Sequence, residues 1–166
     1  MAKTKIAIYP GSFDPITNGH VDLVKRTLGV FDRVVVAIAR NPDKDNSLFT
    51  LEERLEMIRE VFKRFGSRVK GESFDGLLVN YARKSGSKVI IRGLRAVSDF
   101  EYEFQMAMMS RHMKPHIETF FMAAGAKHFY TASRLVKQVA SLGGDVRELL
   151  PEAVYQRLLA RVGPKR

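Results

Sequence analysis

The stretch KIAIYPGSFDPITNGH, residues 5–20, decides the fold that this sequence predicts. Residues 5–9 are an apolar run that predicts a strand ending at Pro10. From Gly19 to Phe31 apolar residues recur at helical spacing, which predicts a helix with Asn18 as its N-cap. A strand, a glycine-containing turn and a helix form the first part of a βαβ unit, so the stretch predicts a parallel sheet.

The same alternation continues outward from this stretch. Further strands are predicted over residues 33–39, 68–72, 88–92 and 118–122. Further helices are predicted over residues 51–65, 77–85, 99–113 and 132–142, with a last one begun by Pro151. The first of these begins with the capping-box pair Thr50 and Glu53. No linker or repeat interrupts the pattern, so we expect one doubly wound, Rossmann-like α/β domain over residues 1–166, with a five-stranded parallel sheet.

Composition excludes several classes of protein. A chain of 166 residues is about one domain, and the absence of cysteine excludes disulfides, thiolate catalysis and zinc sites built on sulfur. No apolar run approaches the roughly 20 residues that cross a bilayer, and the first residues contain no signal peptide, so we expect a cytoplasmic protein. The net charge of +10 favours anionic partners, which are nucleic acid, a membrane surface or phosphorylated ligands.

Ligands of doubly wound sheets bind beyond the carboxyl ends of the strands, which selects the loops at 10–18, 40–49, 93–98 and 123–131. In the first loop, Gly11 and Ser12 form a turn, and the N-terminus of the following helix attracts anions. Gly19 allows a phosphate to approach the backbone, and His20 on the first helical turn can donate to it. A lone histidine is more often a capped, solvated or core residue. The loop contains neither a Walker A motif nor Gly-x-Gly-x-x-Gly.

Two other groups of residues suggest contacts with a phosphorylated ligand. Arg92 and Arg95 flank a glycine at the end of a predicted strand, where they can grip phosphate or act as solvated surface charges. Four methionines lie within residues 106–113. They can fill the core or form a soft wall for a flexible ligand.

Four stretches together resemble the phosphopantetheine adenylyltransferases of the nucleotidyltransferase superfamily. They are GSFDPITNGH (11–20), FTLEER (49–54), IRGLRAVSDFEYE (91–103) and LVKQVA (135–140). The resemblance implies transfer of AMP from ATP to 4'-phosphopantetheine, which gives dephospho-coenzyme A and pyrophosphate. It also implies Mg²⁺ held by the ATP phosphates, a homohexamer, and possible feedback binding of coenzyme A. The substrate phosphate is already ionised near neutral pH, so it can attack the α-phosphorus without a general base.

The resemblance also implies roles for individual residues. The expected catalytic residues are His20, Lys44 and Arg92. The expected ATP site comprises Ser12, Phe13, His20, Gly93, Leu94, Arg95, Glu103, His128, Phe129, Tyr130, Thr131, Ala132, Ser133 and Arg134. The expected phosphopantetheine site comprises Ser12, Lys44, Leu77, Leu78, Arg92 and Met109.

The sequence departs from the family pattern before the last two helices. Relatives usually carry a serine-rich run there, whereas this chain has Thr131, Ala132, Ser133 and Arg134. Arg134 either grips ATP phosphates more strongly or points to solvent. His128 stands where an aromatic residue is common, and Ser12 stands where threonine is usual.

Two alternative functions remain. A nicotinate-nucleotide adenylyltransferase or a cytidylyltransferase would share the Gly-His loop, but the stretch at 91–103 speaks against both. A non-enzymatic nucleic-acid-binding module would account for the positive charge and for the basic tail with Arg157, Arg161, Lys165 and Arg166. The basic residues are spread along the chain and no nucleic-acid-binding motif is present, so we expect no nucleic-acid partner.

Overall fold

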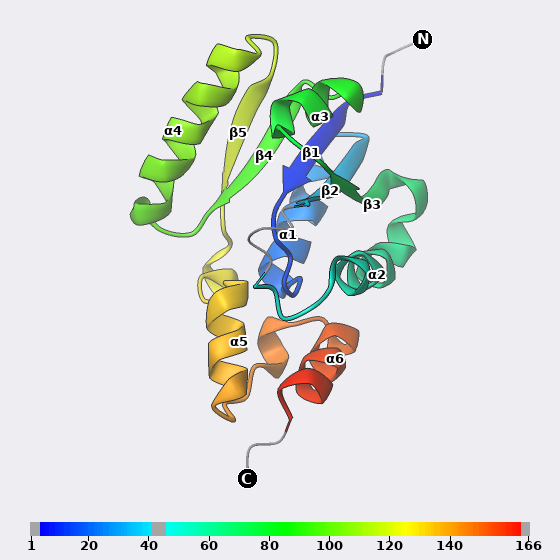
Figure 1. The fold of residues 1–166 in the computed structure, drawn as a ribbon, viewed down its shortest axis with the longest axis vertical. Coiled ribbons are helices and arrows are strands. Elements are labelled where there is room, and N and C mark those ends of the chain that lie inside the picture. Colours follow the sequence, from blue (N-terminus) through cyan, green and yellow to red (C-terminus); the bar gives the residue numbers. More distant parts are fainter. Residues whose placement is uncertain (1–3, 41–45, 164–166) are drawn as a thin grey trace.

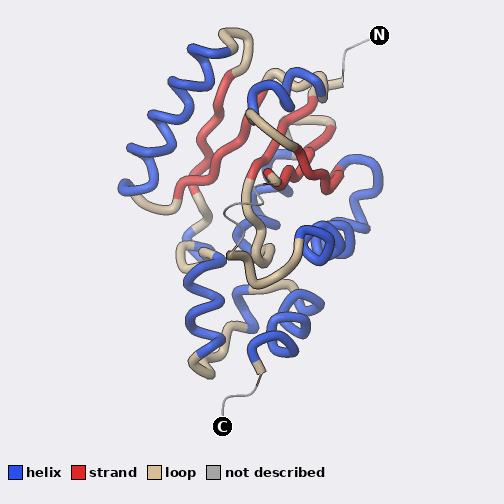
Figure 2. The backbone as a smooth tube through the Cα atoms, viewed as in Figure 1, coloured by secondary structure: helices blue, strands red, loops and turns tan. Residues whose placement is uncertain are grey.

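The computed structural model describes residues 4–40 and 46–163, and its centre is a five-stranded parallel sheet (Figures 1 and 2). The strands are β1 (Ile6–Pro10), β2 (Arg33–Ala39), β3 (Val69–Phe74), β4 (Val89–Leu94) and β5 (Glu118–Ala123). They pair in the order β3-β2-β1-β4-β5, so β1 lies in the middle. The predicted α/β architecture with a five-stranded parallel sheet is therefore confirmed.

The helices connect these strands and continue after the last one. They are α1 (Asn18–Thr27), α2 (Leu51–Phe62), α3 (Leu78–Lys84), α4 (Val97–Met113), α5 (Ser133–Ser141) and α6 (Glu152–Val162). Short 3₁₀ segments lie at η2 (Lys63–Arg68), η3 (Ala126–His128) and η4 (Arg147–Leu149). None of the described helices is both long and apolar enough to span a bilayer.

The sheet has a buried core on each face, because alternate residues of a strand point to opposite sides. In β1, Ala7 and Tyr9 belong to the larger core, which also includes residues of α1, α2, α5 and α6. Ile8 belongs to the smaller core on the other face, together with Val79 of α3. Central strands buried on both faces explain why their sequences are nearly continuous apolar runs.

Two details differ from the prediction at the start of α1. The N-cap is Thr17 and not Asn18, and the helix ends at Thr27, before Phe31. The Asn18 side chain is engaged elsewhere, because its amide donates to the backbone carbonyl of Glu148 at 2.9 Å. A contact between residues so far apart in the chain is invisible to local sequence patterns.

The predicted helix at 51–65 also ends earlier than expected. After Phe62 the chain tightens into η2, and Gly66 has a φ of 54°. This left-handed conformation suits glycine and breaks the helical path. Thr50 and Glu53 form the expected capping box at the beginning of α2.

The strand order creates a switch point between β1 and β4. From β1 the chain builds β2 and β3 on one side, and then returns to add β4 and β5 on the other. The loops that follow β1 and β4 therefore diverge at the carboxyl edge of the sheet, where doubly wound folds bind ligands. The helices α5 and α6 lie beyond this edge (Figure 1).

Candidate active site

A cleft of about 450 Å³ opens at the carboxyl ends of β1 and β4. We call it the α1–α5 cleft because the N-terminal ends of both helices line it. Its lining includes Tyr9, Pro10, Gly11, Ser12, Thr17, Gly19, His20, Leu23, Arg92, Gly93, Arg95, Glu103, Ala124, His128 and residues 131–134. Eleven residues of the predicted ATP and catalytic sets lie here, contributed by β4, by the loops after β1, β4 and β5, and by α1, α4 and α5.

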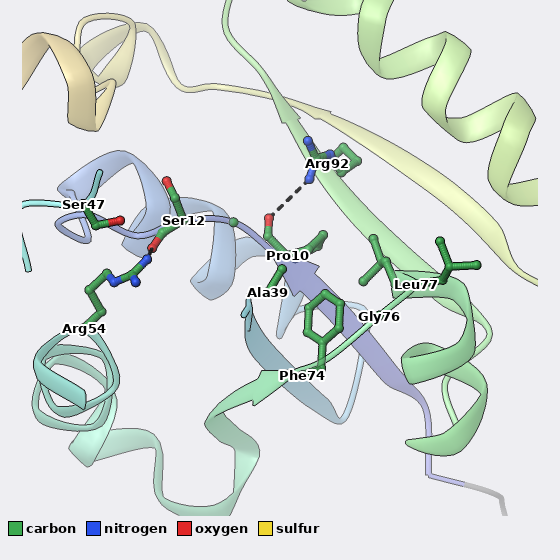
Figure 3. A pocket seen from close by; sticks show the side chains of 11 residues that line it. Pro10, Ser12, Ala39, Ser47, Arg54, Phe74, Gly76, Leu77 and Arg92 are labelled. Atoms are coloured by element: carbon green, nitrogen blue, oxygen red, sulfur yellow. Dashed lines mark hydrogen bonds between the residues drawn. The ribbon is translucent and has the colours of Figure 1, made fainter. Parts of the chain in front are cut away.

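A second cleft, of about 480 Å³, adjoins the first (Figure 3). We call it the α3 cleft. Its lining residues are Pro10, Gly11, Ser12, Ala39, Ser47, Arg54, Phe74, Gly76, Leu77, Leu78 and Arg92. Four predicted phosphopantetheine contacts, Ser12, Leu77, Leu78 and Arg92, therefore lie on one cavity. The residues that line both clefts are Pro10, Gly11, Ser12 and Arg92.

His20 is held in one orientation by the turn that begins α1. Its Nδ1 accepts a hydrogen bond from the Thr17 backbone N–H at 3.0 Å. The neutral ring therefore has its proton on Nε2, which leaves that N–H as a donor. Burial lowers the pKa of His20 to about 4, and the charge of Arg95 lowers it further in the same direction. At neutral pH the ring is an uncharged hydrogen-bond donor on the wall of the cleft.

Phe13 packs against His20 and lines neither cleft. Its side chain is fully buried, although the residue was predicted to contact ATP. Its ring meets the ring of His20 edge-on, with centroids 5.0 Å apart. Its φ of 46° is rare for a bulky residue and marks a strained turn in the loop after β1. That conformation turns the ring into the core and leaves Ser12 on the surface of both clefts.

Arg92 and Glu103 form a two-pronged ion pair between β4 and α4. Nε and Nη2 of Arg92 both donate to the Glu103 carboxylate, and Nη1 donates to the carbonyl of Pro10 at 3.4 Å. A paired fork of this kind fixes the plane of the guanidinium. Glu103 was predicted to hold the nucleotide, and in the structure its carboxylate holds Arg92. Arg95 pairs with Asp99 at 3.3 Å and is partly exposed on the same cleft.

His128 and residues 131–134 form another wall of the α1–α5 cleft. Thr131 is buried against Gly19, where an added Cβ would lie 2.1 Å from Thr131 Oγ1. Glycine at this position thus allows the wall to approach the N-terminus of α1. Ser133 donates through Oγ to the carbonyl of Pro15 at 2.8 Å. Arg134 is exposed and lines the cleft from the first turn of α5.

Some predicted site residues lie elsewhere. Lys44 is outside the described residues. Leu94 and Phe129 line a separate, open depression beside Phe100. Tyr130 is 66% exposed and lines none of the cavities described here.

Met109 is also absent from these cavities and is 55% exposed. Met106 and Met113 take its expected place in an apolar pocket of about 150 Å³ between α3 and α4, which Leu77 and Leu78 also line. The next residue along the helix, Ser110, is buried and lines this pocket. Met109 is turned by about 100° from Ser110 and is not among the residues that line it.

Sequence reasoning missed several residues that shape the site. Arg54 is buried and donates to the carbonyl of Ser12 at 3.1 Å (Figure 3). Asp14 is 3% exposed, accepts from the backbone N–H groups of Leu48 and Phe49 at 2.9 Å each, and pairs with Lys137. Both residues tie the loop after β1 to other elements. Their only sequence signal is a charged residue at a position that the fold buries.

Comparison with known proteins gives the same family on independent grounds. The chain matches the cytidylyltransferase-like family over residues 8–138. It is 55% identical over 155 residues to a phosphopantetheine adenylyltransferase from Syntrophus aciditrophicus, which covers 93% of this chain and 92% of the relative. It is 51% identical over 154 residues to the one from Alkaliphilus metalliredigens, which covers 93% and 97%.

Among solved structures, a candidate nicotinate-nucleotide adenylyltransferase from Vibrio parahaemolyticus superposes with a TM-score of 0.67. That match covers 95% of this chain and 93% of the other at 18% identity, so it supports the fold alone. The sequence relatives are far closer and span nearly the whole chain. The chain therefore belongs to the cytidylyltransferase-like nucleotidyltransferases and, among them, to the phosphopantetheine adenylyltransferases.

Proposed function

We propose that this protein transfers AMP from ATP to 4'-phosphopantetheine and releases dephospho-coenzyme A and pyrophosphate. The observation that carries the proposal is the junction of two clefts at Ser12 and Arg92. ATP occupies the α1–α5 cleft and phosphopantetheine the α3 cleft, so their phosphates meet at this junction. The names of the two sequence relatives described above support the choice of acceptor over nicotinate mononucleotide or a cytidylyl transfer.

The acceptor site has an anionic end and an apolar end. Arg92 lies at the junction with the α1–α5 cleft, while Phe74, Leu77 and Leu78 form an apolar surface of the α3 cleft. Leu77 and Leu78 also line the apolar pocket next to α4, together with Met106. A phosphate joined to a long, flexible arm matches this arrangement, because the arm can follow the apolar residues away from Arg92.

In the reaction, an oxygen of the phosphopantetheine phosphate forms a bond to the α-phosphorus of ATP, and the bond to the bridging β-phosphate oxygen breaks. Two anions must approach each other, and their repulsion at about 4 Å costs a few kcal/mol at an effective dielectric near 20. Arg92, held by Glu103, offsets this repulsion. We assign the same task to Lys44, on the basis of the family resemblance alone.

His20 stabilises the charge that develops on the α-phosphate. Its ring is neutral, and Thr17 fixes its tautomer so that Nε2–H is free to donate. The N-terminus of α1 adds unpaired N–H groups at the same place. Donors that are oriented before the reaction need no reorganisation during it, which is the main source of such stabilisation.

Mg²⁺ is proposed to be carried by the ATP phosphates. The residues that line the α1–α5 cleft fit this arrangement. Their one carboxylate belongs to Glu103 and is paired with Arg92, so the ligands of the ion would come mainly from the phosphates. In the described residues, no three His, Asp or Glu side chains come together as a metal site. When bound, the ion would neutralise phosphate charge. We assign the β- and γ-phosphates to Arg134 and to Arg95, which lie on the cleft wall, the latter beside Asp99.

We also propose a homohexamer in the cytoplasm that binds coenzyme A at the active site and does not bind nucleic acid. Support for assembly comes from exposed aromatic residues on α4 and β5, among them Phe100, Phe104 and Phe120. Exposed apolar surface of this kind usually marks an interface.

Three experiments test these proposals. Sedimentation velocity would give the assembly state, and calorimetry in competition with ATP would test whether coenzyme A binds at the active site. Fluorescence titration with a labelled RNA would test nucleic-acid binding.

A pyrophosphate-release assay tests the reaction. Purified protein receives Mg²⁺-ATP with 4'-phosphopantetheine, and the product is identified by mass spectrometry. We expect pyrophosphate and dephospho-coenzyme A only when this acceptor is present. Nicotinate mononucleotide serves as the matched control acceptor. Turnover with the control and none with phosphopantetheine would refute the assignment.

A further inference from the structure

The hydroxyl group of Tyr9 has no role in the mechanism above, yet it lies on the α1–α5 cleft. Tyr9 is the penultimate residue of β1 and is only 6% exposed. It is nevertheless one of the residues that line the cleft. Its ring is fixed by an edge-on contact with Phe13, at 5.3 Å between centroids and 76° between planes. The ring is therefore packed in the core, and the small exposed part of the side chain lies on the cleft.

No hydrogen bond joins the Tyr9 hydroxyl to another group in residues 4–40 and 46–163. Buried tyrosine hydroxyls usually have a hydrogen-bond partner. No fully enclosed side-chain oxygen or nitrogen within the described chain lacks a partner, so the hydroxyl must open onto the cleft. We therefore expect its hydrogen-bond partner to be a ligand bound in the α1–α5 cleft.

The surroundings indicate what kind of partner this is. The Tyr9 hydroxyl oxygen lies 3.8 Å from where a Cβ of Gly93 would be, so it is beside the carboxyl end of β4. Arg92 and Arg95 flank this glycine, and both act electrostatically on Tyr9, as does the carboxylate of Glu103. The Glu103 charge is paired with Arg92. The charges that act on Tyr9 are thus two arginines and one carboxylate, and together they favour a negatively charged ligand oxygen.

Burial raises the pKa of Tyr9 well above its ordinary value, and this effect outweighs the lowering by Arg92 and Arg95. The phenol therefore keeps its proton throughout the range in which the protein works. It can donate a hydrogen bond, but it cannot serve as a phenolate base. The ring of His20 lies 6.2 Å away, centroid to centroid, so two neutral donors line the same part of the cleft.

We propose that the Tyr9 hydroxyl donates a hydrogen bond to a phosphate oxygen of the nucleotide bound in the α1–α5 cleft, as a second neutral donor beside His20. The inference rests on the proposed function for the identity of the ligand. The donor is oriented in advance by the Phe13 contact, so binding does not need to order it. Without a nucleotide, the hydroxyl is left to solvent in the cleft.

The test replaces Tyr9 by phenylalanine, which removes the hydroxyl and keeps the ring. Calorimetry with α,β-methylene-ATP, which cannot transfer AMP, measures nucleotide affinity, and the pyrophosphate assay gives kcat and KM separately. We expect Tyr9→Phe to lower the affinity and kcat/KM for ATP roughly 10- to 100-fold, the usual effect of one hydrogen bond to a charged group. Placing 4-aminophenylalanine at position 9 restores a donor and should recover part of the loss.

Tyr155→Phe is the matched control, because Tyr155 is similarly buried but belongs to α6 and lines neither cleft. Equal losses in both variants, or analogue affinity within twofold of wild type in Tyr9→Phe, would overturn the inference. The analogue binds without an acceptor. If wild-type protein bound it but made no dephospho-coenzyme A, the proposed reaction would fail while Tyr9 could still be judged from affinity.

Discussion

Replacing Gly19 by alanine should separate the two walls of the α1–α5 cleft. An added Cβ would lie 2.1 Å from Thr131 Oγ1 and 3.2 Å from Thr131 Cβ. Non-bonded heavy atoms rest about 3.5–4.0 Å apart, so the wall must retreat by roughly 1 Å or more. Thr131 is 4% exposed, and its hydroxyl donates to the carbonyl of His128 at 2.7 Å. It cannot rotate away without losing that bond.

The cost follows from this geometry. Forcing extra volume into a packed site typically destabilises a protein by about 1–3 kcal/mol. For a domain of this size each kcal/mol lowers Tm by about 2–4 °C, so we expect a loss of about 2–12 °C for Gly19→Ala. Movement of residue 131 also takes the first turn of α5 away from α1. We therefore expect the KM for ATP to rise at least about tenfold, by loss of orientation.

A double-mutant cycle with Thr131→Ala isolates the contact. Removing Oγ1 leaves the Thr131 Cβ position 3.2 Å from the new methyl group, which a small shift can accommodate. The double variant should be less destabilised than the sum of the two single variants, with a coupling of about 1–2 kcal/mol. Urea unfolding of all four proteins measures this coupling energy. The protomer concentration is kept the same throughout, because assembly affects stability. Additivity within about 0.5 kcal/mol would refute the reasoning.

Four further predictions concern charge and donors. His20→Ala should lower kcat by about 100- to 1,000-fold with a smaller change in ATP affinity, and a pyrophosphate-release rate within about threefold of wild type would contradict the role. Because the pKa of His20 is lowered to about 4, the unfolded chain binds a proton that the folded chain does not as pH falls from about 6.5 towards 4. Wild type should therefore lose stability over this range relative to His20→Gln in urea titrations, and parallel curves would count against it. Arg134→Ser should raise the KM for ATP several-fold while Arg134→Lys retains most of the affinity, if the cation grips phosphates; equal KM values for both variants and wild type would place Arg134 in solvent. Asp14→Asn breaks the buried pair with Lys137 and sets an amide NH₂ against a backbone N–H of Leu48 or Phe49, whereas Lys137→Met leaves the buried Asp14 charge without its counter-ion; each should cost up to about 3 kcal/mol in chemical denaturation, and a loss below about 0.5 kcal/mol in both would contradict this.

Much of the fold was predictable from local pattern. The apolar runs of β1, β2 and β4 have the composition of strands buried on both faces, and the structure places them at the centre of the sheet. Thr50 and Glu53 marked the beginning of α2 because a capping box is satisfied by residues three apart. Both patterns depend on residues close together in the chain, so they predict local structure without knowledge of the tertiary fold.

Parts of the site were predictable and parts were not. Gly19, His20, Arg92 and Leu77 were identified from a motif or a resemblance, and each lines at least one of the two clefts. Met109 was placed on the acceptor path, but the turn of α4 presents Met106 there. The rotation of a helix about its axis depends on how its neighbours pack, and the sequence of α4 mixes polar and apolar residues around the helix without a strong stripe to indicate it.

The sequence by itself determined the alternation of strands and helices, the loops that carry ligands, and the family. Tertiary structure alone decided which groups act together. Thr131 meets Gly19, Glu103 holds Arg92, and the Tyr9 hydroxyl reaches a cleft between strands that are not adjacent in the chain. Periodicity reports whether a residue is buried, because burial repeats with the local backbone geometry. It does not report what the residue is buried against, because that contact forms only when distant elements pack.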